Sequence, residues 1–276
     1  MSIITLTSDI GLQDYLVGAM KGHLWQHCPD CQVIDISHHI SPFNLPQATY
    51  ICKSAFAFFP AGTFHFVLIN LFDKKQDHVL MALHNGQYIA CADNGLLSMI
   101  TEGIPEKVIK LPLEKDAPKN TFTIIHTFMQ AVKALQSGQS IEQVGELTTD
   151  LVIKNKLQPL TGDDYIEGQI IHIDSFENVV VNITRSQFDA QRNNRRFSIF
   201  FRRDEVITQI SETYADVAEG QKLALFNAAG YLEVAVNKGN AAGLFGLQGF
   251  QRDQLMAPTG LSAQLSFYQT VRIVFE

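Results

Sequence analysis

The first twenty residues combine an apolar strand, a short polar turn and the start of a helix. Ile3–Leu6 is the strand, a helix begins near Val17, and Asp9 and Gly11 lie between them. Open α/β sheets bind ligands at the carboxyl ends of their strands, and a carboxylate can accept both hydroxyl protons of a ribose diol. An aspartate in this place also caps helices. This stretch alone therefore leaves two interpretations of Asp9 open, a helix cap and a ligand-binding residue.

Strands and helices alternate up to about residue 150. The sequence predicts strands at 3–7, 31–36, 63–71, 78–84, 87–91 and 108–111, and helices at 14–27, 47–59 and 121–137. Asn85-Gly86 is the dipeptide that favours a tight hairpin turn, here between 78–84 and 87–91. Such alternation predicts an α/β domain with a mostly parallel sheet over residues 1–160.

The pattern changes at the turn-rich segment 157–164. Period-two alternation then predicts hairpins from 166–173 with 179–183 and from 222–226 with 231–236, strands at 197–201 and 271–275, and a short helix within 239–247. We therefore predict a second, smaller, all-β domain over residues 164–276.

Composition excludes several classes of protein. The 276 residues carry a net charge of −7, with 46% hydrophobic and 18% charged residues. This acidic balance argues against a nucleic-acid partner. No apolar run reaches the roughly 18 residues of a membrane span, and the N-terminus leads straight into a strand without a signal peptide. We expect a cytoplasmic protein with no membrane partner.

The cysteines leave one alternative open. Cys28-Pro-Asp-Cys31 has C-x-x-C spacing, and His23 and His27 precede it at i, i+4 on a predicted helix. A closed zinc site needs four ligands, usually from two pairs, and Cys52 and Cys91 supply no second pair. A zinc site from the first group stays open, but ordinary reduced thiols are the default in the cytoplasm. We expect no metal.

Short polar stretches recur beside the predicted strands, and each alone has a structural explanation; Asp-Asn-Gly, for example, is a turn by its chemistry. Their order is more specific, because it resembles the S-adenosyl-L-methionine hydroxide adenosyltransferase family, relatives of fluorinases and chlorinases, nearly from end to end. The matching motifs are Thr5-Leu-Thr-Ser-Asp-Ile-Gly11, Tyr15-Leu-Val-Gly-Ala-Met-Lys21, Asp35-Ile-Ser-His-His-Ile-Ser-Pro42, Ala92-Asp-Asn-Gly-Leu96, Ile173-Asp-Ser-Phe-Glu-Asn-Val-Val-Val-Asn182 and Leu232-Glu-Val-Ala-Val-Asn-Lys-Gly-Asn-Ala-Ala242.

The resemblance implies an α/β adenosyl-binding domain and a smaller β-barrel-like C-terminal domain. It also implies a homotrimer, with each site between the N-terminal domain of one subunit and the C-terminal domain of the next. The ligand would be S-adenosyl-L-methionine, as substrate or bound molecule, with no other cofactor. Motif positions carry over six ligand-binding residues: Asp9, Asp174, Asn178, Tyr214, Ala241 and Ala242.

The resemblance also implies a role for each of these residues. Asp9 would bind the ribose hydroxyls, Asp174 would face the amino-acid end of the methionine, and Asn178 would face the adenine. Tyr214 would be an aromatic wall for the base. The backbone of residues 241–242 would meet the adenine edge, as purine recognition requires.

The family's reaction is displacement at the ribose C5′, in which water attacks and methionine leaves as a neutral thioether. Hydroxide-using members hold and activate the water with an aspartate, an arginine and a histidine. Here Asn70, Asp77 and Thr123 stand at those positions. Neither asparagine nor threonine is a base near pH 7, so Asn70 and Thr123 mark a degenerate catalytic triad. Glu177 replaces a glycine of the family pattern.

Other residues are candidates to replace the triad. His126 lies one helical turn after Thr123, and Asp73, Asp77 and His78 lie in or near the altered loop. The first interpretation is a hydrolase that converts S-adenosyl-L-methionine to adenosine and methionine with weakened catalysis. A non-catalytic adenosine- or S-adenosyl-L-methionine-binding protein is the alternative, and a related displacement on another adenosyl substrate is a third.

Overall fold

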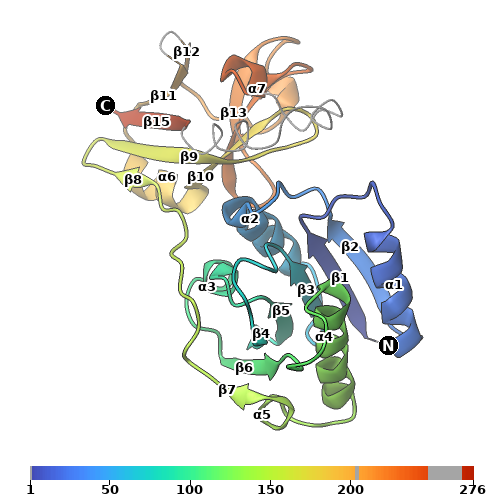
Figure 1. Ribbon diagram of the computed structural model, residues 1–276. Coiled ribbons are helices and arrows are strands. Elements are labelled where there is room, and N and C mark those ends of the chain that lie inside the picture. The colour runs from blue at the N-terminus through green and yellow to red at the C-terminus, as the bar shows by residue number, and fades with distance from the viewer. Residues whose placement is uncertain (1, 203–204, 248–268) are drawn as a thin grey trace. The chain divides into compact units, whose positions relative to one another are not determined.

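The computed structural model describes residues 2–202, 205–247 and 269–276, and the chain divides into two compact units, Met1–Lys156 and Leu157–Glu276 (Figure 1). Each unit has its own buried apolar core. Within the described ranges, no helix is long and apolar enough to cross a membrane.

The N-terminal unit is built on a seven-stranded sheet in the order β2-β1-β3-β5-β4-β6-β7. Its strands are β1 (Ile3–Ser8), β2 (Gln32–Ser37), β3 (Phe64–Leu68), β4 (His78–His84), β5 (Gln87–Cys91), β6 (Lys107–Pro112) and β7 (Glu146–Leu147). The pairs β2–β1, β1–β3 and β3–β5 are parallel. The pairs β5–β4, β4–β6 and β6–β7 are antiparallel. The sheet is thus mixed rather than mostly parallel, because the β4–β5 hairpin reverses the strand direction.

Helices cover both faces of this sheet (Figure 1). They are α1 (Leu16–His27), α2 (Leu45–Phe56), α3 (Leu96–Thr101), α4 (Thr121–Gln136) and α5 (Ile141–Val144). Phe66 and Leu68 of β3 share a core with α1 and α4, whereas Val67 and Ile69 share a second core with α2 and α3. Alternate side chains of this strand therefore pack into the cores on opposite faces of the sheet. Both sets are apolar, which explains the continuous apolar run in the sequence.

The C-terminal unit is an antiparallel sheet in the order β12-β11-β15-β9-β10-β14-β13, with β8 paired to β9. Its strands are β8 (Leu160–Thr161), β9 (Tyr165–Ile173), β10 (Val179–Thr184), β11 (Phe197–Arg202), β12 (Glu205–Ile207), β13 (Lys222–Phe226), β14 (Tyr231–Val236) and β15 (Thr270–Phe275). The terminal strands β12 and β13 contact each other, so the sheet curls almost into a barrel.

The expectation of an all-β second domain is wrong in one respect, because helix α6 (Arg185–Arg192) follows β10. Thr184 accepts a hydrogen bond from the Gln187 backbone, and the Gln187 side chain accepts one from the Thr184 N–H. This reciprocal capping box starts a helix, and Phe188 anchors the helix in the core. The described part of the unit also contains two short helical turns, η1 (Tyr214–Asp216) and α7 (Ala241–Leu244).

The expectation of ordinary thiols throughout is also corrected. Cys28 and Cys31, just beyond α1, form a disulfide, while Cys52 and Cys91 are buried free cysteines. The Cα atoms of the bonded pair are 5.4 Å apart, within the range that disulfide geometry requires. The C-x-x-C spacing therefore serves a covalent cross-link at the end of α1.

Candidate functional site

Asp9 lies directly beyond β1, at the carboxyl edge of the parallel strands. Its Oδ2 accepts hydrogen bonds from the backbone N–H groups of Phe43 and Asn70, each at 3.1 Å. These bonds join the end of β1 to the loop after β2 and to the end of β3. Oδ1 has no hydrogen bond from the residues that the structure describes. Asp9 is thus fixed through one oxygen, while the other is available to a ligand hydroxyl.

Asn70 continues this edge at the end of β3. Its backbone is left-handed, with φ of 46°, and its side-chain amide donates to Asp73 at 3.0 Å. Asn94, which follows β5, donates from its amide to the carbonyls of Ile69 and Asn70. The ends of three neighbouring parallel strands are therefore tied together, at the edge where α/β sheets bind ligands.

The Asp-Ile-Ser-His motif supports the same edge from β2. The buried His38 contacts Ser8 at 2.7 Å through Nδ1 and Asp35 at 3.2 Å through Nε2. Lys21 donates to the other Asp35 oxygen at 2.5 Å. Partial burial acts to raise the pKa of Asp35, but the bonds from Lys21 and His38 outweigh it and hold that pKa below its usual range. This network positions the turn that carries Asp9.

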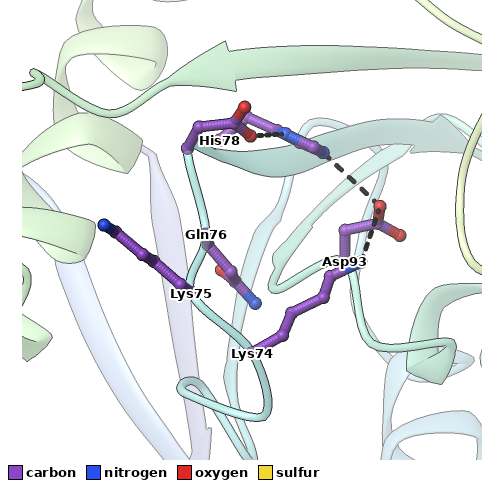
Figure 2. A pocket seen from close by; sticks show the side chains of 6 residues that line it. Lys74, Lys75, Gln76, His78 and Asp93 are labelled. Atoms are coloured by element: carbon purple, nitrogen blue, oxygen red, sulfur yellow. Dashed lines mark hydrogen bonds and ion pairs between the residues drawn. The ribbon is translucent and has the colours of Figure 1, made fainter.

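A cavity of about 430 Å³ adjoins the ends of β5 and β4. Figure 2 shows its lining residues, Lys74, Lys75, Gln76, Asp77, His78 and Asp93. The His78 ring lies between two carboxylates, with Nδ1 2.6 Å from Asp77 and Nε2 3.4 Å from the buried Asp93. The bond from His78 lowers the pKa of Asp77. Sequence reasoning named Asp77 and His78 but missed their link to Asp93, which the β4–β5 register creates.

Thr123 and His126 make their contacts within α4, in the loop before it, and with α1. The Thr123 hydroxyl donates to the Pro118 carbonyl at 2.6 Å, and its N–H donates to Asn120, the N-cap of α4. His126 instead faces His23 and His27. Across the described ranges, neither Thr123 nor His126 hydrogen-bonds to Asp9. Their catalytic roles stay predictions.

In the C-terminal unit, the structure brings Asp174 and Asn178 together. Asp174 Oδ1 accepts from the backbone N–H groups of Phe176 and Asn178, both at 2.9 Å, and Oδ2 accepts from the Asn178 amide at 3.1 Å. Asn178 is buried. The pair holds the turn between β9 and β10 in one shape, so any ligand at this turn meets a preorganised carboxylate.

A second polar pair lies on β14 and η1. The Tyr214 hydroxyl donates to Glu233 at 2.6 Å, and Tyr214 is 43% exposed. Burial raises the pKa of Glu233. The hydrogen bond from Tyr214 acts to lower that pKa, and the negative charge of Asp174 raises it further. Sequence reasoning missed Glu233, although a carboxylate amid the apolar residues of β14 was the signal.

Ala241 and Ala242 are fully buried at the start of α7. The Ala242 N–H donates to the Glu177 carbonyl at 2.9 Å, and its own carbonyl accepts from Phe245 and Leu247. Both backbone groups of Ala242 therefore already have partners within the unit. This contact joins α7 to the Asp174 turn.

Glu177 adopts φ of 63° in that turn, at the position where the family pattern has glycine. A left-handed conformation costs a residue with Cβ about 1–2 kcal/mol, and glycine relieves this cost. Part of the relief is offset because glycine makes the unfolded chain more flexible. We expect Glu177→Gly to raise the free energy of unfolding by about 0.5–1 kcal/mol, measured by denaturant unfolding. Glu177→Ala keeps the Cβ; an equal gain from alanine would show that the carboxylate, not the backbone, is the cause.

The fold and the edge residues define a two-unit protein, an α/β unit with polar groups at its strand ends followed by a near-barrel unit. Models of the S-adenosyl-L-methionine hydroxide adenosyltransferase N-terminal and C-terminal domains match residues 4–145 and 168–252. The chain belongs to this family.

Relatives with established names cover most of the chain. It is 27% identical over 256 residues to an (R)-S-adenosyl-L-methionine hydrolase of Methanocaldococcus jannaschii, spanning 88% of this chain and 92% of the relative. A fluorinase of Nocardia brasiliensis is 24% identical, over 87% and 92% of the two chains. The crystal structure of an uncharacterized conserved protein from Thermotoga maritima shares the fold, with a TM-score of 0.78, 21% identity and coverage of 99% and 100%.

Proposed function

We propose that this protein hydrolyses S-adenosyl-L-methionine to adenosine and methionine, with Asp9 binding the ribose. Membership of the family and the hydrolase relatives support the reaction. The observation that carries the proposal is the geometry of Asp9, which is anchored through Oδ2 at the carboxyl edge while Oδ1 is available. Two charge-assisted hydrogen bonds to a ribose diol are what this arrangement can supply.

The reaction needs a proton acceptor but no general acid. A water oxygen forms a bond to C5′ as the C5′–S bond breaks, and that electron pair leaves with the neutral sulfur of methionine. The water loses one proton, which a base takes up. Since Asn70 and Thr123 are not bases, we propose His78 for this role, with Asp77 and Asp93 stabilising the protonated ring.

The spacing of the strands agrees with this assignment. Leu80 pairs with Cys91 across β4 and β5, a register that sets His78 opposite Asp93. Two strands, β3 and β5, separate β1 from β4, so the end of β1 and the start of β4 at His78 lie about 14 Å apart. We propose that a ribose on Asp9 directs its C5′ side toward the cavity around His78, so that the ribose and the attacking water span this distance.

We also propose a cytoplasmic homotrimer with no cofactor other than the adenosyl substrate. The residues carried over by motif are divided between the two units, with Asp9 in the first and Asp174, Asn178 and Tyr214 in the second. A trimer in which neighbouring subunits contribute different units would complete each site. Light scattering coupled to gel filtration measures the mass, and a monomer that turns over substrate would contradict the trimer.

The direct test joins binding to product formation. A ligand that binds only the native state must stabilise it, so we expect S-adenosyl-L-methionine and adenosine each to raise the melting temperature. Incubation with S-adenosyl-L-methionine should release adenosine and methionine in equal amounts on chromatography, also when chloride or fluoride is added. A melting shift without adenosine would identify a binding protein instead, and no shift at saturating ligand would refute the site.

A further inference from the structure

Three imidazole rings cluster where α1 packs against α4 in the N-terminal unit. His23 and His27 lie one turn apart on α1, and His126 comes from α4. One nitrogen of each ring lies within 4.8 Å of the others. The ring centroids are 4.4 Å apart for His23 and His27, 5.9 Å for His23 and His126, and 5.0 Å for His27 and His126.

This cluster is separate from the candidate adenosyl site. Helix α1 begins at Leu16, after the carboxyl end of β1, and returns to the start of β2, which is parallel to β1. At about 1.5 Å per residue, His23 and His27 lie roughly 10 and 16 Å along the helix from Leu16. His23 and His27, with the His126 ring beside them, therefore lie away from the Asp9 end of α1.

Hydrogen bonds prepare the rings to act as ligands. His27 Nδ1 lies 2.9 Å from the His23 carbonyl; donation to that oxygen leaves the lone pair of Nε2 free. The Gln130 amide nitrogen lies 3.1 Å from His126 Nε2; a 180° flip of the amide lets its oxygen accept the Nε2 proton, which leaves the lone pair of Nδ1 free. Such outer hydrogen bonds orient metal-binding histidines.

His23 supplies the third nitrogen. Its Nε2 is buried and has no hydrogen-bond partner among the residues that the structure describes. A buried polar atom without a partner is costly and needs an explanation. Burial and the neighbouring His27 and His126 lower the pKa of His23.

We propose that His23, His27 and His126 bind a divalent transition-metal ion, with zinc as the best match. Three neutral imidazoles suit zinc, and a fourth position is left for water. Zinc–nitrogen bonds of about 2.0–2.1 Å place tetrahedral ligand nitrogens about 3.4 Å apart. Small rotations of the three rings would bring their nitrogens to this separation. The ion cross-links α1 to α4.

This site differs from both expectations drawn from the sequence. A zinc site built on the C-x-x-C motif would use Cys28 and Cys31, but their disulfide removes both thiolates. His126 takes their place as a ligand from another helix. The expectation of no metal is replaced by the proposed three-histidine site, which does not depend on adenosyl chemistry.

The first test uses the unmodified protein after chelator treatment. Titration with Zn²⁺ in a calorimeter should show one ion bound per chain and a raised melting temperature. X-ray absorption of the zinc form should show nitrogen ligands only, and Co²⁺ should give the visible bands of a four-coordinate site. Absence of zinc binding, or sulfur in the zinc shell, would overturn the proposal.

The second test identifies the ligands. His27→Gln and His126→Gln keep a polar side chain of similar reach, and each should weaken zinc binding by more than about 100-fold, since even outer-shell changes cost 10–100-fold. His84→Ala, at the far end of β4, is the matched control and should bind as the unmodified protein does. Circular dichroism of each metal-free variant confirms folding. Unchanged affinity in both folded variants would show that the metal binds elsewhere.

Discussion

Replacing Asp9 by asparagine is expected to weaken binding of S-adenosyl-L-methionine and adenosine by about 100-fold or more while the fold persists. The asparagine oxygen can still accept from the Phe43 and Asn70 N–H groups, as Asp9 Oδ2 does. The other end becomes an NH₂ donor where the ribose needs an acceptor. Two hydrogen bonds to a charged group contribute about 1.5–3 kcal/mol each, and their loss corresponds to at least about 100-fold.

Calorimetry with adenosine measures this affinity without turnover. Asp14→Asn is the matched control, because Asp14 lies in the same turn and accepts from the Leu16 N–H at 2.9 Å, a bond that asparagine retains. We expect Asp14→Asn to bind adenosine normally, and both variants to melt near the unmodified protein without ligand. Normal adenosine affinity in Asp9→Asn would remove Asp9 from the ribose site.

Elements fixed by local chemistry were predictable from the sequence. The hairpin of β4 and β5 has the bounds that Asn85-Gly86 indicated, and both turn residues have positive φ, 50° and 73°, as a type I′ turn requires. Helix α6 was equally local, since Thr184 and Gln187 form a capping box. It was missed because the segment is mostly polar, with Phe188 as its one buried side chain, and so resembles a loop.

Features set by tertiary packing were not predictable. His23 and His126 are far apart in the sequence and meet only because α1 and α4 cover the same face of the sheet. Asp93 likewise lies opposite His78 only because of the register in which β4 pairs with β5. Motif comparison named Asp174 and Asn178, which hydrogen-bond to each other. It could not show that the Thr123 hydroxyl donates to the Pro118 carbonyl just before α4.

Because Asn70 and Thr123 replace members of the family's triad, another residue must accept the proton from the attacking water. Asn70 and Thr123 each donate to a neighbouring protein oxygen, Asp73 and Pro118 respectively. Neither can take a proton from water. Among the cavity-lining residues, His78 is the one imidazole, and it already lies between two carboxylates. We therefore propose His78 as the acceptor of the proton from water.

His78→Gln is accordingly expected to lower kcat by about 100- to 10⁴-fold, the usual contribution of a general base, with little change in KM. Glutamine fills similar space and can donate to Asp77 or Asp93, but it cannot accept a proton from the attacking water. Adenosine release at saturating S-adenosyl-L-methionine measures kcat, and the melting shift with adenosine verifies that the site is intact.

His84→Gln supplies the comparison, because His84 ends the strand that His78 begins and lies beside the Asn85 turn, away from the cavity. It should leave kcat, KM and the adenosine-induced melting shift unchanged. A histidine acting only as a structural bridge between Asp77 and Asp93 would change stability and KM along with kcat. Retention of full kcat in His78→Gln would instead mean that water reaches C5′ without a histidine base, so that catalysis relies on positioning and on the departure of a neutral thioether alone.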